Sequence, residues 1–326
     1  MSLFTQIRKL FSKQQSAQII GIALQQGSLN CCATSSSSRQ NSTTNKAIEL
    51  PQASFHKIQV ESSDFSKAIS ALQAEYPLVG QCNLVLNAQQ TQIVQIDKPS
   101  VPSHEIVDAL KWQVKDLVSI SPDNMVLDYF DDPALVGGKE KVHVVCASVN
   151  ELKKLVTVIN QTGTEVVSIT IEEFAFANLL PVQKDACLLV CQQPNEEITL
   201  LIVKQGKLYF YRRLRGFSEI ANKTEDELMM TIVDSLALEI QRSSDYFERQ
   251  LKQAPIQQIK VLLPMASESF FARKLAENSH LPVTLLALPD VYQQHREYAA
   301  AIGATLLEAR LVEKEQLQAQ ELSHAS

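Results

Sequence analysis

Residue types that often carry chemistry, such as Cys and His, form no recognisable motif along this chain of 326 residues. The six cysteines lie mostly within apolar runs and lack the paired short spacings of a zinc site or a disulfide framework, so we interpret them as reduced core residues. None of the six histidines has a second ligand type at metal spacing, and no serine lies in a glycine-flanked elbow. The sequence therefore predicts neither a metal site nor a catalytic nucleophile.

Two charged clusters could bind ions, and each has a simpler interpretation. Asp128, Asp131 and Asp132 lie where a predicted strand ends and could hold a cation, but the Pro and Gly residues that follow favour a solvated loop. The arginines within residues 212–215 follow an aromatic run and could bind phosphate. On a strand with alternating faces, we favour ion pairs with nearby Glu and Asp residues.

The overall charge argues against a nucleic-acid partner. Lys and Arg total 30 against 36 Asp and Glu, giving a net charge of −6 with the two signs interspersed. No apolar run approaches the roughly 20 residues of a membrane span, and the N-terminus lacks a stretch of the signal-peptide type, so we expect a cytoplasmic protein. Residues 1–18 predict a short basic amphipathic helix, which packs on its own domain or touches an anionic membrane surface or a partner.

The pattern of strands and helices occurs twice. Residues 17–33 predict two strands joined by a Gln-Gln-Gly-Ser turn, and residues 186–214 predict a three-stranded meander with tight turns. Each meander is followed by alternating helices and strands, and Thr224 with Glu227 forms a capping box that starts a long helix. We predict a duplicated α/β architecture with a cleft between its halves.

Three segments, occurring in the family's order, resemble the PilM family, the actin-like cytoplasmic proteins of type IV pilus assembly. Residues 105–130 with residues 140–180 are similar to the inserted subdomain of that family. Residues 239–247 look like its signature helix, and residues 299–309, with Gly303, are similar to its C-terminal helix. Length and Gln-rich composition are closest to the MshI branch, which serves mannose-sensitive haemagglutinin (MSHA) pili.

The resemblance implies an actin-like fold, that is, a duplicated ribonuclease-H-like α/β fold with an inserted α/β subdomain. The expected organisation along the chain is an amphipathic segment at 1–18, a first actin-like half at 19–100, the inserted subdomain at 101–180, a second half at 181–312 and a polar tail at 313–326 that frays.

An actin-like cleft binds ATP through glycine-rich strand turns, whose backbone N–H groups meet the phosphates beside a magnesium-binding carboxylate. By the resemblance, Ala23 replaces the acid and Gln25 the glycine of the first turn, and Cys191 replaces the acid of the second. The adenosine turn corresponds to a segment with Met265 and Glu268 and no glycine. We therefore predict no cofactor; ATP with Mg²⁺, in a switch or a weak ATPase, is the alternative.

The resemblance also implies a partner, the short cytoplasmic tail of a PilN-like single-span protein, and a location peripheral to the inner membrane. We predict that this tail binds where the inserted subdomain meets the first half, with main-chain pairing at a sheet edge. The candidate contacts are Trp112, Leu127 and Tyr129; Trp112 either anchors the peptide or only seals the edge of its helix. The predicted function is a non-catalytic scaffold.

Overall fold

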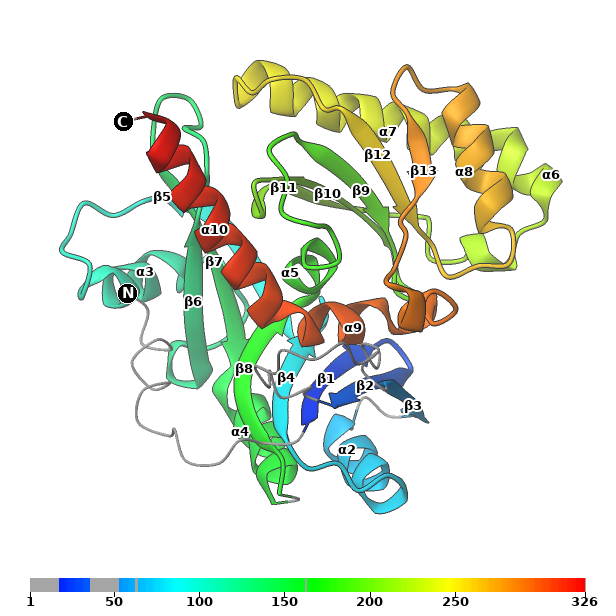
Figure 1. Ribbon diagram of the computed structural model, residues 1–326. Helices are drawn as coiled ribbons and strands as arrows, with labels where there is room; N and C mark the ends of the chain where they lie inside the picture. The colour runs from blue at the N-terminus through cyan, green and yellow to red at the C-terminus, as the bar shows by residue number, and fades with distance from the viewer. Residues whose placement is uncertain (1–17, 36–52, 62–63, 162, 326) are drawn as a thin grey trace, which may run out of the picture.

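The computed structural model describes the backbone of residues 18–35, 53–61, 64–161 and 163–325. The predicted amphipathic helix of residues 1–18 lies outside these ranges except for Gln18, which begins the first strand. Most of the polar stretch at residues 35–45 also lies outside them. The described chain forms two lobes with a smaller sheet at one side (Figure 1).

The first lobe is built on a five-stranded sheet with the order β3-β2-β1-β4-β8 (Figure 1). Strands β1 to β3 are antiparallel neighbours, whereas β4 and β8 run parallel to β1. Alternate residues of β1 face helices α2 and α4 and form one core with them, as the period of two in a strand requires. The elements are β1 (Gln18–Gln25), β2 (Ser28–Ser35), β3 (Ala53–Gln59), α2 (Phe65–Glu75), β4 (Gln81–Leu86), α4 (Val149–Asn160) and β8 (Glu165–Ile171).

The second lobe repeats this sheet with the order β11-β10-β9-β12-β13 and the same strand directions. The predicted duplication is therefore confirmed. The capping box of Thr224 and Glu227 is present, and the helix it starts runs on through two π-helical turns at Leu228–Ile232 and Tyr246–Gln250. The elements are β9 (Cys187–Cys191), β10 (Ile198–Lys204), β11 (Lys207–Leu214), α6 (Glu225–Glu227), α7 (Val233–Asp245), β12 (Gln258–Leu262), α8 (Glu268–Glu277) and β13 (Val283–Leu285).

The inserted subdomain is a three-stranded antiparallel sheet with the order β5-β7-β6, covered on one face by helix α3. Its elements are β5 (Thr91–Asp97), α3 (Ile106–Val114), β6 (Met125–Asp131) and β7 (Lys141–Ser148). The expected boundaries at 101 and 180 need correction, because β5 pairs in this sheet and β8 pairs in the first lobe. By strand pairing, the insertion runs from β5 to β7.

Two helices, α5 (Glu172–Ala177) and α9 (Ala299–Thr305), lie between the lobes and share one apolar core with both sheets (Figure 1). Their backbones approach closely, and glycine permits this. A Cβ added to Gly303 of α9 would lie 1.8 Å from the carbonyl oxygen of Ala175 in α5. A Cβ added to Gly21 of β1 would lie 2.0 Å from the carbonyl oxygen of Ala301. Ala23, two residues on and on the same face of β1, is a small residue for the same reason.

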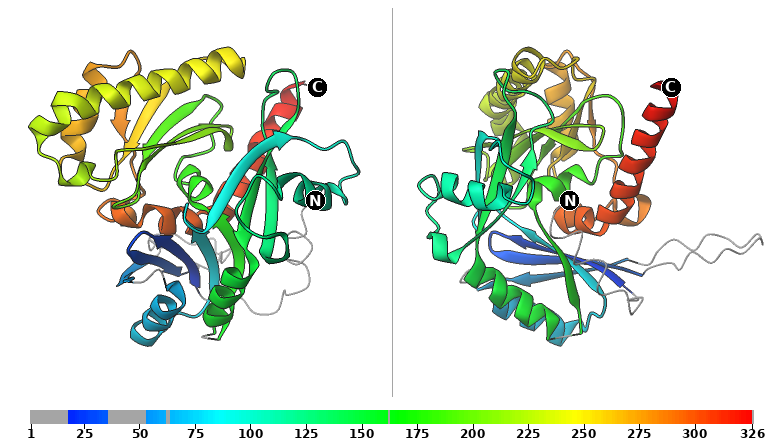
Figure 2. Two further views of the ribbon diagram at one scale, coloured as in Figure 1. Left: turned by 180° about the vertical axis from the view of Figure 1, so that it is seen from behind. Right: turned by 90° about the vertical axis from the view of Figure 1, so that its left-hand side faces the viewer.

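The C-terminal segment does not fray as expected but continues as helix α10 (Leu307–Ala325). Its first turns are fixed to the segment that follows α5: Arg310 Nε donates to Asn178 O at 2.8 Å, and Glu313 Oε2 accepts from Val182 N at 3.2 Å. Lys314 packs on Gly206 of the turn between β10 and β11, and only the later turns of the helix stand off from the two lobes in the side view of Figure 2. Within the described ranges, no helix is both long and apolar enough to cross a bilayer.

The close packing of α9 on α5 predicts that Gly303→Ala destabilises the protein. The added methyl group cannot fit 1.8 Å from a backbone oxygen, so α9 must shift, at a cost of about 1–3 kcal/mol in the free energy of unfolding measured by urea titration. Gly27→Asn is the control, because nothing lies within 4 Å of that position and Asn tolerates its φ of +79°. Equal stability of Gly303→Ala and the wild type would contradict this packing.

Candidate functional site

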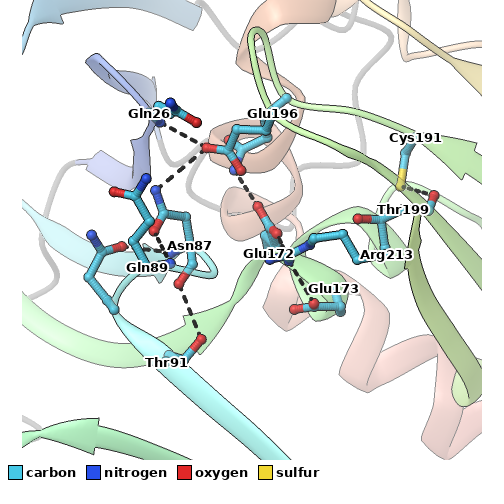
Figure 3. Close-up of polar contacts among 12 residues, drawn as sticks. Gln26, Asn87, Gln89, Thr91, Glu172, Glu173, Cys191, Glu196, Thr199 and Arg213 are labelled. Carbon is cyan, nitrogen blue, oxygen red and sulfur yellow. Dashed lines mark hydrogen bonds and ion pairs between the residues drawn. The ribbon is translucent and has the colours of Figure 1, made fainter. Parts of the chain in front are cut away.

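Residues of the first two turns that correspond to a nucleotide site face each other between the lobes, and polar side chains of the protein lie between them (Figure 3). At the first turn, Gln25 is fully buried. Its Nε2 donates to Glu297 O at 3.2 Å, and its Oε1 accepts from Ser28 Oγ at 3.2 Å. Gln25 therefore links β1 to the segment that leads into α9.

The backbone of this turn already binds an acidic group of the protein. Gln26 N donates to Glu196 Oε1 at 2.8 Å, and Glu196 lies on the turn between β9 and β10 of the other lobe. Asn87 Nδ2, beyond the end of β4, reaches the same oxygen at 3.5 Å. The carboxyl group of Glu196 thus accepts the hydrogen bond that a turn N–H would offer to an anion, and it links the lobes directly.

Next to Glu196, the acidic side chains of Glu172 and Glu173 surround the guanidinium group of Arg213 (Figure 3). Arg213 of β11 binds Glu172, and its Nη2 also lies 3.1 Å from Glu173 Oε1. Gln193 Nε2 donates to Glu172 Oε2 at 2.5 Å, and Glu196 shares a hydrogen bond with Glu172. A hydrogen bond between two carboxyl groups requires a proton on one of them.

The surroundings of this cluster favour protonated carboxyl groups. Burial, and next the charge of Glu172, raise the pKa of Glu196 to about 8. The same two causes raise the pKa of Glu173 to about 7, against the opposing effect of Arg213. Because three carboxyl groups face a single cation here, binding of a further anion such as a triphosphate is electrostatically unfavourable.

The residues at the remaining predicted nucleotide positions are also packed against or hydrogen-bonded to other parts of the protein. Cys191 is buried, its Sγ lies 3.4 Å from Thr199 O, and burial raises the pKa of its thiol well above the ordinary value. Met265 packs against the core of the second lobe. Glu268 accepts from Leu263 N at 2.6 Å and from Arg296 Nη2 at 2.6 Å, so it closes the turn after β12. Among the described residues, no group of three His, Cys, Asp or Glu side chains could hold a metal ion.

A second site lies where the inserted subdomain meets the first lobe. It is a groove of about 260 Å³, lined by residues 126–130 of β6, Val145 and Ala147 of β7, and residues 169–171 of β8, with apolar side chains of β4, α4 and α5 at its ends. Both β6 and β8 are edge strands of their sheets. Among the described residues that line the groove, Asp128 alone is charged.

The three predicted peptide contacts are separated by the structure. Leu127 and Tyr129 line the groove, but their side chains also pack into the core beneath α3. Asp132 N donates to Lys141 O at 3.0 Å. In an antiparallel ladder every second residue bonds to the neighbouring strand, so Leu127 and Tyr129, five and three residues earlier, point their backbone N–H and C=O groups away from β7. Trp112 lies on α3 with 72% of its surface exposed and does not line the groove. Lys115 Nζ lies 5.1 Å from the centroid of its ring.

No protein-family model and no curated protein sequence matches this chain. Among solved structures, a chain of a PilM–PilN type IV pilus biogenesis complex is similar, with a TM-score of 0.64 and 15% sequence identity. The match covers 89% of this chain and 98% of that chain. A protein of unknown function with an actin-like ATPase fold from Bacteroides thetaiotaomicron is also similar, with a TM-score of 0.50 and 9% identity. That match covers 91% of this chain and 98% of that chain. The fold of this protein is actin-like. The predicted fold class is confirmed.

Sequence reasoning missed the residues that close the interlobe space. The arginine run was interpreted as pairing with nearby acids in solvent. Arg213 does pair with acids, but its partners Glu172 and Glu173 are buried and lie about 40 residues away in sequence. The one available signal was an acidic pair directly after a strand, at the start of α5, where a helix N-terminus favours negative charge. Glu196 gave no signal, because its role depends on a contact with the other lobe.

The raised carboxyl pKa values predict how stability depends on pH. Between the ordinary pKa of a glutamate and the raised pKa of about 8, the folded state holds more protons than the unfolded state, so the free energy of unfolding falls as pH rises from about 5 to 8. Glu196→Gln mimics the protonated side chain, which can still accept from Gln26 N. We expect it to weaken this fall and to exceed the wild type by on the order of 2 kcal/mol at pH 8.5, measured by urea unfolding.

Glu165→Gln, at an exposed position on β8, is the matched control and should leave the pH dependence unchanged. A Glu196→Gln variant that loses stability with rising pH as steeply as the wild type does would contradict the protonated cluster.

Proposed function

We propose that this protein is a non-catalytic scaffold in a type IV pilus assembly machine, of MSHA type, and that it binds the cytoplasmic N-terminal tail of a PilN-like inner-membrane protein. The observation that carries the proposal is the groove between the inserted subdomain and the first lobe. The solved chain with a TM-score of 0.64 comes from a complex of PilM with PilN, which supports the choice of partner. On this proposal the protein is cytoplasmic and reaches the inner membrane through its partner.

The shape of the groove favours an extended segment over a helix or a compact ligand. Five consecutive residues of β6, 126–130, line it, and a strand rises about 3.3 Å per residue, so an extended partner that pairs along them would contribute about five residues. The backbone groups that Leu127 and Tyr129 turn away from β7 can pair with such a segment. Main-chain pairing supplies affinity, and the apolar floor selects alternate side chains.

The interlobe contacts support a role without nucleotide chemistry. A nucleotide phosphate at the first turn would have to displace Glu196 from Gln26 N and enter next to Glu172 and Glu173. Such a move brings anions together in a poorly solvated place, which is unfavourable. Binding a partner at the groove leaves these interlobe contacts in place.

Val126→Glu tests the groove. Val126 lines it with 39% of its surface exposed, so a carboxylate there should obstruct the apolar floor while leaving the fold intact. We expect affinity for a fluorescent synthetic peptide of a PilN-like cytoplasmic tail to fall at least about tenfold, equivalent to 1.4 kcal/mol. The measurement is fluorescence anisotropy with the full chain.

Two controls accompany this titration. Val107→Glu places the same charge at a position of similar exposure, 43%, on α3 outside the groove, and it should bind like the wild type. Trp112→Ala should also bind like the wild type if the peptide contacts only the groove. Absence of wild-type binding at high micromolar peptide would refute the proposed function, and equal loss in both valine variants would refute the location.

Mg²⁺-ATP should not stabilise the protein. A ligand specific for the folded state at 100 times its dissociation constant adds about 2.7 kcal/mol and raises the melting temperature by several degrees. Because Glu196 and its neighbours already fill the phosphate position, we expect no shift in a thermal melt with millimolar Mg²⁺-ATP, compared with Mg²⁺ alone. A saturable rise in the micromolar range would favour the ATP-switch alternative.

A further inference from the structure

Asp128 differs from the other acidic residues on and after strand β6. Asp131 Oδ1 lies 2.7 Å from Lys98 Nζ, and Asp132 Oδ2 lies 3.3 Å from His143 Nε2. Among the described residues, no basic side chain forms an ion pair with Asp128. Its carboxylate lies in the apolar groove and accepts one hydrogen bond, from Tyr129 N at 2.8 Å.

That hydrogen bond belongs to the free edge of the strand. Tyr129 turns its backbone N–H away from β7, so this group is available to an added strand. In the free protein the side chain of Asp128 satisfies it. An extended segment that pairs with this edge would bring its own carbonyl oxygen to Tyr129 N and release the carboxylate of Asp128.

A released carboxylate in this groove needs a new partner. Asp128 is exposed on its strand, so water still reaches its carboxylate in the free protein, although partial burial against the groove raises its pKa, against the opposing hydrogen bond from Tyr129. A bound segment would remove more of that water, and a charged group left unpaired in apolar surroundings is costly. A cation supplied by the segment offsets this cost, and no other charged group lines the groove to compete for it.

We infer that Asp128 is a specificity-determining residue of the groove, which selects extended apolar segments that carry a Lys or Arg side chain opposite Tyr129. This inference rests on the proposed function and names the chemistry of the partner. It agrees with a general property of inner-membrane proteins, whose cytoplasmic segments close to the membrane are enriched in Lys and Arg. The groove therefore distinguishes a basic apolar tail from an apolar tail without charge.

A peptide array provides the test. Ten-residue peptides from a PilN-like cytoplasmic tail carry Lys, Gln or Glu at each position in turn, and affinity is measured for the full-length wild type, Asp128→Asn and Asp128→Lys. The amide oxygen introduced by Asp128→Asn can still accept from Tyr129 N, so this variant removes the charge and keeps the edge contact. Asp131→Asn is the matched control, since it removes the same charge from the same strand outside the groove.

At one position of the tail, the wild type should prefer Lys over Glu by about tenfold or more. Asp128→Asn should lose most of this preference, Asp128→Lys should reverse it, and Asp131→Asn should retain it. Binding of all peptides without a charge preference, or equal loss of preference in Asp128→Asn and Asp131→Asn, would overturn the role of Asp128 and leave the proposed function intact. Absence of binding by any peptide would overturn both.

Discussion

The close approach of α9 to strand β1 and to helix α5 is the constraint on which the rest of the structure depends. Gly21 and Gly303 allow backbone to meet backbone at distances that no side chain could occupy. This contact joins the two sheets through one apolar core, with α5 from the first lobe and α9 from the segment after the second. The relative position of the lobes then decides which polar groups face one another across the gap.

Across that gap, the protein supplies its own hydrogen-bond acceptor. An actin-like fold brings two strand turns together, and their N–H groups favour a negative charge between them. Here the carboxylate of Glu196 takes the contact with Gln26 N, and the neighbouring acids share one guanidinium group and protons. The lobes are therefore linked by side chains that belong to the chain itself, and this link depends on protonation.

The elements of this fold could be predicted from sequence because they depend on local patterns. Alternating strands, tight turns and the capping box of Thr224 and Glu227 are properties of short segments, and each was found where expected. Strand β5 was placed within the first half, at residues 19–100, because its pattern does not specify its partner, and only pairing with β7 places it in the insertion. The extension of helix α10 beyond residue 312 was missed because its polar sequence gives little amphipathic signal, whereas Arg310 and Glu313 fix the start of the helix through tertiary contacts.

The candidate site was less predictable for the same physical reason. The substitutions Ala23, Gln25 and Cys191 could be noted in sequence, but the buried acids that occupy the cleft come from distant segments. The side-chain role expected of Tyr129 became a backbone role once the register of β6 and β7 was known. An acidic side chain such as Asp128 gives the same sequence signal whether it is solvated or lies unpaired in a groove.

Helix α5 connects the two sites. Its first residues, Glu172 and Glu173, bind Arg213 between the lobes, and the next residue, Phe174, lines the groove. Phe174 also packs edge-to-face on Phe130 of the inserted subdomain, with ring centroids 4.9 Å apart. In α5, which has six residues, the residue that lines the groove directly follows the two that bind Arg213. The contacts that link the lobes therefore also fix one wall of the groove, and a preformed wall lowers the entropy lost when a segment binds.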